Sequence, residues 1–161
     1  MKLIICMLSL ALLLPASAEA VFSRGDKAPD FEALTLQDKS VRLSDSKGTP
    51  LLIELGATWC PSCNEQAHQI DKIRDFLKQQ GIIYVTVFLA DPADAVENYL
   101  KEEGLNPPDQ VLLDSGEART NYLVLSIPRL ILIDSQFNIV FDEMVLNAEQ
   151  IKSRITEELP L

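Results

Sequence analysis

Trp59-Cys60-Pro61-Ser62-Cys63 is the stretch that decides how this chain folds. It follows an apolar run at 51–55 and opens a segment of helical periodicity, so it lies where a buried strand passes into a helix. Backbone N–H groups at a helix N-terminus favour negative charge and lower the pKa of a thiol there. A Cys-x-x-Cys pair at this junction indicates redox chemistry.

The first 20 residues are typical of a secretory signal peptide. A basic residue precedes an apolar run over 3–14, and proline and small residues follow, which predicts cleavage after Ala18 or Ala20. The run is shorter than the roughly 20 apolar residues of a membrane span, so we favour export over an uncleaved anchor. Residues 21–161 are expected to form a single domain.

Cleavage would also remove Cys6, which leaves Cys60 and Cys63 as the only thiols of the mature chain. The pair must then close on itself or exchange with another molecule. Disulfides persist in exported compartments, so we expect a periplasmic protein. The formal charge of −10 makes nucleic acid a poor candidate partner. We expect a monomer that needs no cofactor.

The remaining chain alternates between strand-like and helix-like segments. We expect helices from Cys60 to about Gln80, from 93 to about 103, over 117–123 and from Asn147 or Ala148 to Leu159. Strands are expected at 32–36, 40–43, 51–55, 82–89, 111–113, 130–133 and 138–144. This order predicts an α/β fold with a central mixed sheet flanked by helices, preceded by an N-terminal hairpin.

Several roles for the cysteine pair compete. A zinc site takes about four ligands, whereas this chain offers Cys60, Cys63 and its sole histidine, His68. A purely structural disulfide across two residues would stabilise the fold little. We therefore favour disulfide reduction over two alternatives: a disulfide oxidase or isomerase, and a non-enzymatic copper or zinc carrier. We assign His68 an exposed or helix-packing position rather than catalysis.

In the redox interpretation Cys60, which is nearer the helix start and expected to be more exposed, attacks a substrate disulfide. Cys63 then resolves the mixed disulfide. Glu54 lies inside the apolar strand, so we expect a desolvated carboxyl with a raised pKa, as a proton acceptor for Cys63 requires. The alternative is that the strand register turns Glu54 toward solvent.

The candidate substrate-binding residues flank the thiols in sequence or precede a later strand. We expect Trp59 to pack as a lid beside the dithiol, at a rim that substrate can touch. An X-Pro bond is cis in only about 5–6% of cases, so sequence physics alone predicts a trans Ile127-Pro128 bond. The candidates are Trp59, Pro61, Ser62, Ile127 and Pro128.

Several motifs together resemble the secreted thioredoxin-fold oxidoreductases of the TlpA/ResA/CcmG type. They are Gly25-x-x-Ala28-Pro29-x-Phe31, the Trp-Cys-x-x-Cys element, Ile127-Pro128, and Leu132-Ile133-Asp134 followed by Asn138-Ile139-Val140. The resemblance implies a thioredoxin-like sheet of four or five strands with a central insertion at 91–123. It implies a cis Pro128 facing the dithiol, with backbone groups of Ile127 bonded to substrate. Disulfide-containing exported proteins would be substrates, and a membrane protein of the DsbD or CcdA type the electron donor.

Two positions depart from that family. Many members carry Glu three residues after the second cysteine, where this chain has Gln66, with Glu65 one position away. Many also carry a kink-forming proline where this chain has His68, which predicts a straighter helix. A Thr-x-x-Cys peroxidatic motif is absent from the sequence, which argues against a peroxidase.

Overall fold

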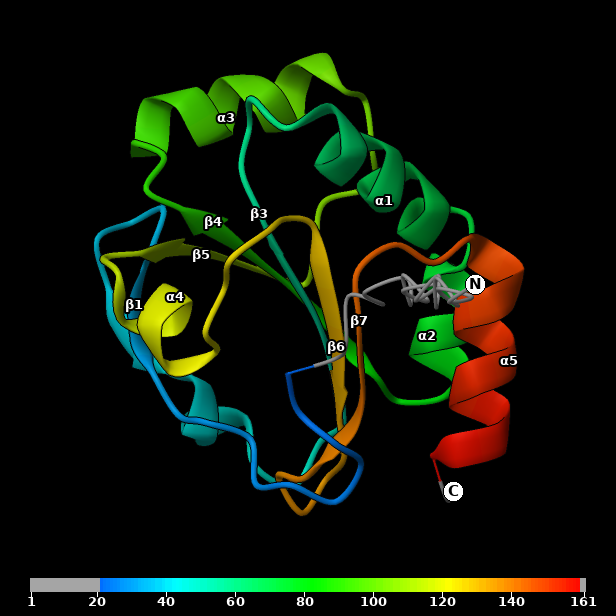
Figure 1. Ribbon diagram of the computed structural model, residues 1–161. Coiled ribbons are helices and arrows are strands. Elements are labelled where there is room, and N and C mark those ends of the chain that lie inside the picture. The colour runs from blue at the N-terminus through cyan, green and yellow to red at the C-terminus, as the bar shows by residue number, and fades with distance from the viewer. Residues whose placement is uncertain (1–20, 160–161) are drawn as a thin grey trace, which may run out of the picture.

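The strands form one seven-stranded mixed sheet in the order β2-β1-β5-β4-β3-β6-β7 (Figure 1). The structure, a computed structural model, describes residues 21–159, so the predicted signal peptide and Cys6 lie outside the described part. Within 21–159, no helix is long and apolar enough to cross a membrane.

The strands are β1 (Glu32–Thr35), β2 (Ser40–Arg42), β3 (Leu51–Gly56), β4 (Ile83–Leu89), β5 (Gln110–Asp114), β6 (Arg129–Ile133) and β7 (Ile139–Glu143). The helices are α1 (Pro61–Asp71), α2 (Arg74–Gln79), α3 (Ala93–Glu102), α4 (Glu117–Asn121) and α5 (Ala148–Glu158), with a 3-10 helix at Leu43–Ser46.

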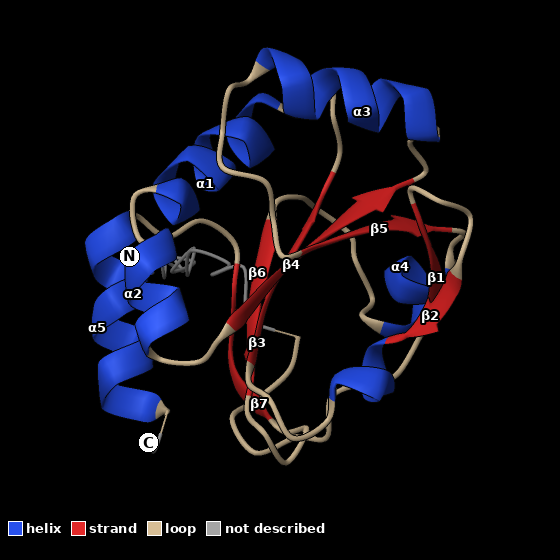
Figure 2. Ribbon diagram, turned by 180° about the vertical axis from the view of Figure 1, so that it is seen from behind, coloured by secondary structure: helices blue, strands red, loops and turns tan. Residues whose placement is uncertain are grey.

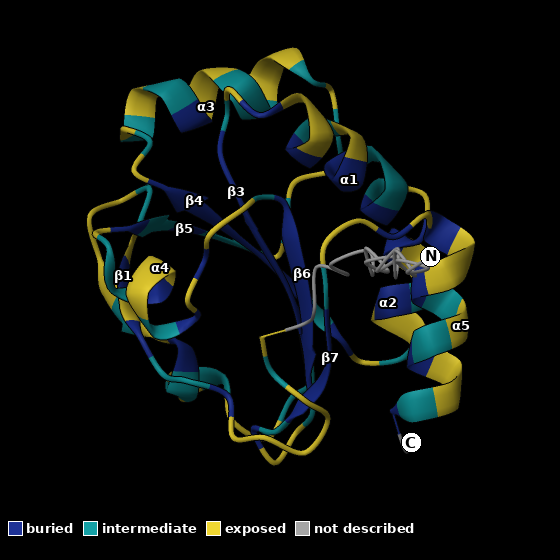
Figure 3. Ribbon diagram, in the orientation of Figure 1, coloured by how far each residue is buried: buried dark blue, intermediate teal, exposed yellow. Residues whose placement is uncertain are grey.

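The predicted α/β order is confirmed, and β3 lies at the centre of the five strands β5-β4-β3-β6-β7. It pairs parallel with β4 and antiparallel with β6, and all six of its residues are buried (Figure 3). Helices α1, α2 and α5 lie on one side of the sheet and α4 on the other (Figures 1 and 2). Leu51, Ile53 and Leu55 pack in one core layer and Leu52 in the opposite one. A strand covered on both faces reads as a continuous apolar run, which explains residues 51–55.

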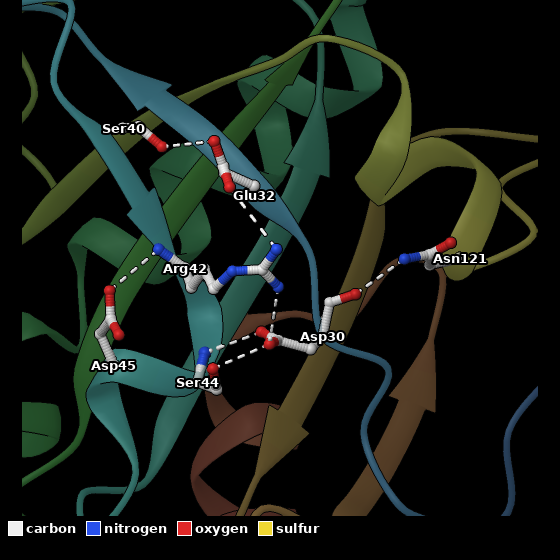
Figure 4. Close-up of polar contacts among 7 residues, drawn as sticks. All are labelled: Asp30, Glu32, Ser40, Arg42, Ser44, Asp45 and Asn121. Carbon is white, nitrogen blue, oxygen red and sulfur yellow. Dashed lines mark hydrogen bonds and ion pairs between the residues drawn. The ribbon is translucent and has the colours of Figure 1, made fainter.

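The predicted N-terminal hairpin joins the main sheet, because β1 pairs antiparallel with β5. It adds two strands to the five of the thioredoxin-like core. Asp30 anchors its base: the backbone N–H and the hydroxyl of Ser44 donate to its carboxylate, at 2.9 and 2.8 Å. The side chain of Asn121 on α4 donates to the carbonyl oxygen of Asp30 at 2.7 Å (Figure 4).

The expectation of one helix from Cys60 to about Gln80 is wrong, since it is interrupted between α1 and α2, although α1 runs through His68 without a break. The N–H of Ile73 donates to the carbonyl of Ile70, a tighter turn than an α-helix makes. Both flanks of the break are tied to the segment 106–109. Asp71 accepts two hydrogen bonds from Asn106, and Arg74 pairs with an aspartate of the same segment at 2.8 Å. These tertiary contacts override the local helical pattern.

Candidate active site

The two thiols are joined as a disulfide at the start of α1. Cys60 is the N-cap residue, and its Sγ accepts a hydrogen bond from the N–H of Cys63 at 3.2 Å. Pro61 occupies the first helical turn, where a missing N–H costs nothing. Ser62 Oγ lies 3.4 Å from Cys60 Sγ. The predicted strand-to-helix junction is confirmed, and free N–H groups at the helix start can stabilise a thiolate there.

Ile127 and Pro128 lie beside this disulfide. The bond between them is cis, so the trans bond expected from frequencies alone is wrong and the isomer implied by the resemblance is the one found. The carbonyl oxygen of Ile127 lies 4.0 Å from Cys60 Sγ, and Ile127 packs against the small apolar cluster that the two cysteines form with Ala57. The strand register explains the proximity, because Arg129 at the start of β6 pairs with Leu55 near the end of β3. In this disulfide form both cysteines are buried, at 5% and 4% exposure.

Exposed apolar side chains line a groove next to the disulfide. Trp59 is 73% exposed and Leu125 is 94% exposed, and with Ile127 and Arg119 they border a groove of about 140 Å³. The expectation that Trp59 packs as a lid is therefore wrong. Trp59 lies in the loop between β3 and α1, and residues 21–159 leave most of its surface uncovered.

Asp91 holds the loop that carries Trp59 and Cys60. Its carboxylate accepts hydrogen bonds from the N–H and the hydroxyl of Thr58, at 3.0 and 2.8 Å. Asp91 follows β4, which runs parallel to β3, so the ends of these two neighbouring strands meet at one edge of the sheet. Sequence analysis did not identify this residue, since a single aspartate after a strand is a common loop feature.

Glu54 is buried in the centre of the sheet, with 2% of its surface exposed. The alternative in which register turns it toward solvent is wrong, because β3 is covered on both faces. Burial raises the pKa of Glu54 to about 7, and a hydrogen bond from the hydroxyl of Tyr84 partly opposes this rise. The raised pKa expected for this carboxyl is confirmed.

Glu54 and Cys63 line the same small cavity, of about 30 Å³, beneath α1. Gly56 also borders it, and an added Cβ there would lie 3.3 Å from both Cβ and Sγ of Cys63. The glycine therefore allows the buried thiol to approach β3 closely. The hydroxyl of Thr86, also on the cavity wall, has no hydrogen-bond partner among the described residues. The arrangement places a carboxyl acid and a sulfur atom around a space that can hold a water molecule.

The residues that depart from the resembled family are structural or exposed. Gln66 is fully buried and bonds through its amide to the backbone N–H and carbonyl of Leu146, at 2.9 and 3.0 Å. Glu65 is exposed. His68 Nε2 lies 3.5 Å from a carboxylate oxygen of Glu103 near the end of α3. Among residues 21–159, no three His, Cys, Asp or Glu side chains gather as a metal ion would require.

Comparisons with known proteins identify the family and match the fold. A family model described as AhpC/TSA family matches residues 24–141. The thiol-disulfide oxidoreductase ResA of Geobacillus kaustophilus is 30% identical over 68 residues, which are 42% of this chain and 39% of that protein. The thioredoxin-like protein YneN of Bacillus subtilis is 27% identical over 77 residues, 47% of this chain and 45% of that protein. The matches therefore span less than half the length of either relative.

A solved structure from Chlorobium tepidum, described as a thiol:disulfide interchange protein DsbE, shares the fold. It superimposes with a TM-score of 0.74 at 24% identity, covering 84% of this chain and 96% of that one. The thioredoxin-like architecture expected from the sequence is confirmed.

Proposed function

Because this chain belongs to the AhpC/TSA family of thioredoxin-like proteins, we propose that it is a periplasmic oxidoreductase that reduces disulfides in exported proteins. The observation that carries the proposal is the disulfide at the N-terminus of α1, with the cis-proline loop on one side and a buried acid behind it. Each part has a chemical task in thiol-disulfide exchange.

The reaction begins from the reduced protein. The Cys60 thiolate attacks one sulfur of a substrate disulfide, forming a mixed disulfide and releasing the other substrate sulfur as a thiolate. Cys63 then attacks Cys60 Sγ, which releases the second substrate thiolate and closes the disulfide seen in the structure. Two electrons pass from the dithiol to the substrate. The N–H groups at the start of α1 favour the Cys60 thiolate before it attacks.

Cys63 must lose its proton before it can attack, and it is buried beneath the helix. Glu54 supplies the acceptor, because its pKa of about 7 lets its carboxylate take a proton near neutral pH. The cavity that both residues line gives the proton a route between them. A carboxyl with an unperturbed pKa would be ionised but too weak a base for this step.

Substrate would bind across the groove beside the disulfide. The backbone of Ile127 lies next to Cys60, so an extended substrate segment could add alongside it as a strand. Trp59, Leu125 and the residues between the cysteines would contact the substrate side chains. Each turnover leaves the protein oxidised, so reduction requires an electron donor, for which we propose a membrane protein of the DsbD or CcdA type.

Two cysteine variants test the assignment. Cys60→Ser should abolish reduction of a polypeptide disulfide, whereas Cys63→Ser should still attack and accumulate the mixed disulfide, detectable by mass spectrometry. Retained turnover in Cys60→Ser would refute the assignment.

The reduction potential decides the direction of electron flow. A value nearer about −270 mV supports a reductase, and one nearer about −120 mV supports the oxidase or isomerase alternative.

A further inference from the structure

The carboxyl of Glu54 is surrounded by groups from several elements packed against β3. Cys63 and Asp71 come from α1, Arg74 from α2, Tyr84 and Thr86 from β4, and Tyr99 from α3, all on the wall of the same cavity. Among the described residues, the hydroxyl of Tyr84 donates the only hydrogen bond to this carboxyl. The parallel register explains the contact, since Leu52 pairs with Tyr84 and Glu54 with Thr86, on one face of the sheet.

Tyr84 is fixed independently of this contact. Its backbone N–H donates to a carboxylate oxygen of Asp109 at 2.8 Å. The guanidinium of Arg74 lies over its ring, 5.0 Å from the ring centre, and itself pairs with Asp109 at 2.8 and 3.2 Å. The tyrosine is thus contacted at its backbone and at its ring face, and its hydroxyl points to Glu54.

Tyr99 offers a natural comparison in the same cavity. Its hydroxyl lies 3.4 Å from the side-chain oxygen of Asn64, and no hydrogen bond joins it to Glu54. Both tyrosines thus border the space behind the disulfide, but only Tyr84 bonds the acid. Removing each hydroxyl in turn separates the effect of that bond from the effect of a lost polar group in the cavity.

We propose that Tyr84 is a positioning residue for the exchange reaction: its hydroxyl holds the Glu54 carboxyl in the cavity beside Cys63 and favours the ionised form that accepts the proton. The inference rests on the acid role of Glu54 in the proposed function. Burial disfavours the carboxylate and raises its pKa, and the hydrogen bond from Tyr84 opposes that effect. Without this bond, Glu54 would bind its proton more tightly and accept one from Cys63 only at higher pH.

The direct test is a titration of Glu54 in the oxidised protein, where neither cysteine carries a proton. Glutamate labelled with ¹³C at the side-chain carboxyl reports each midpoint by NMR, and Glu54→Gln identifies the Glu54 signal by its loss. We expect Tyr84→Phe to raise the midpoint by about one pH unit, because the carboxylate loses a hydrogen bond that favours its charged form. A shift of this size means that Glu54 binds its proton roughly tenfold more tightly. Tyr99→Phe should leave the midpoint within a few tenths of a unit. An unshifted midpoint in Tyr84→Phe overturns the inference.

A second readout measures the Cys63 step itself. The rate at which a preformed mixed disulfide on Cys60 is resolved should rise to its plateau about one pH unit higher in Tyr84→Phe than in wild type and Tyr99→Phe. A shifted NMR midpoint with an unshifted resolution profile would overturn the role of Tyr84 in exchange. If the pH dependence of the resolution rate in Glu54→Gln matched that of the wild type, the acid role on which the inference rests would instead be refuted.

A further variant tests the inference in case Tyr84→Phe does not fold. Arg74→Lys keeps the positive charge but removes the planar group over the tyrosine ring, so it should shift the Glu54 midpoint in the same direction by a smaller amount. A midpoint equal to wild type in Arg74→Lys, together with failure of Tyr84→Phe to fold, would count against the inference.

Discussion

Replacement of Glu54 by Gln should reduce the loss of folding stability that the protein undergoes as the pH rises. In the folded state burial raises the pKa of Glu54 to about 7, from the ordinary value of 4.5 for a glutamate. The fold therefore binds this proton more tightly than the unfolded chain does. The stabilising contribution is complete below about pH 4.5, is lost as pH rises toward 7, and is absent above that value.

The size of the loss follows from the difference of about 2.5 pH units between the two states, each worth about 1.4 kcal/mol. Between pH 4.5 and 8 the wild type should lose about 3 kcal/mol that Glu54→Gln retains. For a domain of this size, that corresponds to roughly 6–12 °C in Tm. Gln keeps the shape of Glu and an oxygen that can accept the hydrogen bond from Tyr84.

The assay is urea unfolding of the oxidised proteins at several pH values between 4.5 and 8. Other titrating groups affect both proteins alike, so the difference between the two curves isolates Glu54. Glu65→Gln on α1 provides a control, because Glu65 is exposed and this variant should follow the wild type throughout. Curves for wild type and Glu54→Gln that run parallel over this range would show that burial does not raise the pKa of this carboxyl.

Three further substitutions probe other parts of the structure. Asp142→Ala should cost about 3–5 kcal/mol in urea unfolding, because it leaves the buried guanidinium of Arg129 unpaired; a loss below about 1 kcal/mol would contradict this. Leu125→Ser should change the free energy of unfolding by less than about 0.5 kcal/mol, since Leu125 is 94% exposed, yet slow reaction with polypeptide disulfides; if it reacts with polypeptides and small disulfides at wild-type rates, this rim does not contact substrate. Gly56→Ala should destabilise the oxidised form by about 1 kcal/mol or more, because the new Cβ meets Cys63 at 3.3 Å; this should appear as a more oxidising reduction potential, and an unchanged potential would refute the steric argument.

Local patterns were sufficient to locate the paired cysteines and the buried carboxyl of Glu54. The apolar run at 51–55 predicts a strand covered on both faces, and that coverage forces Glu54 into the interior. The same run followed by a helical pattern places Cys60 at a helix N-terminus. Local periodicity fails where distant contacts intervene: the break before Arg74 depends on the segment 106–109, and the exposure of Trp59 depends on how its loop is held.

The sequence by itself determined that two thiols stand at a strand-to-helix junction with a carboxyl in the preceding strand, because these residues are neighbours along the chain. Only the tertiary structure decided what faces them. The hydroxyl of Tyr84 bonds to Glu54, which is 30 residues away in the sequence, and the carbonyl of Ile127 lies beside Cys60, which is 67 residues away. Both contacts follow from the pairing of β3 with β4 and with β6, and a one-residue change in either register would turn different side chains toward the site.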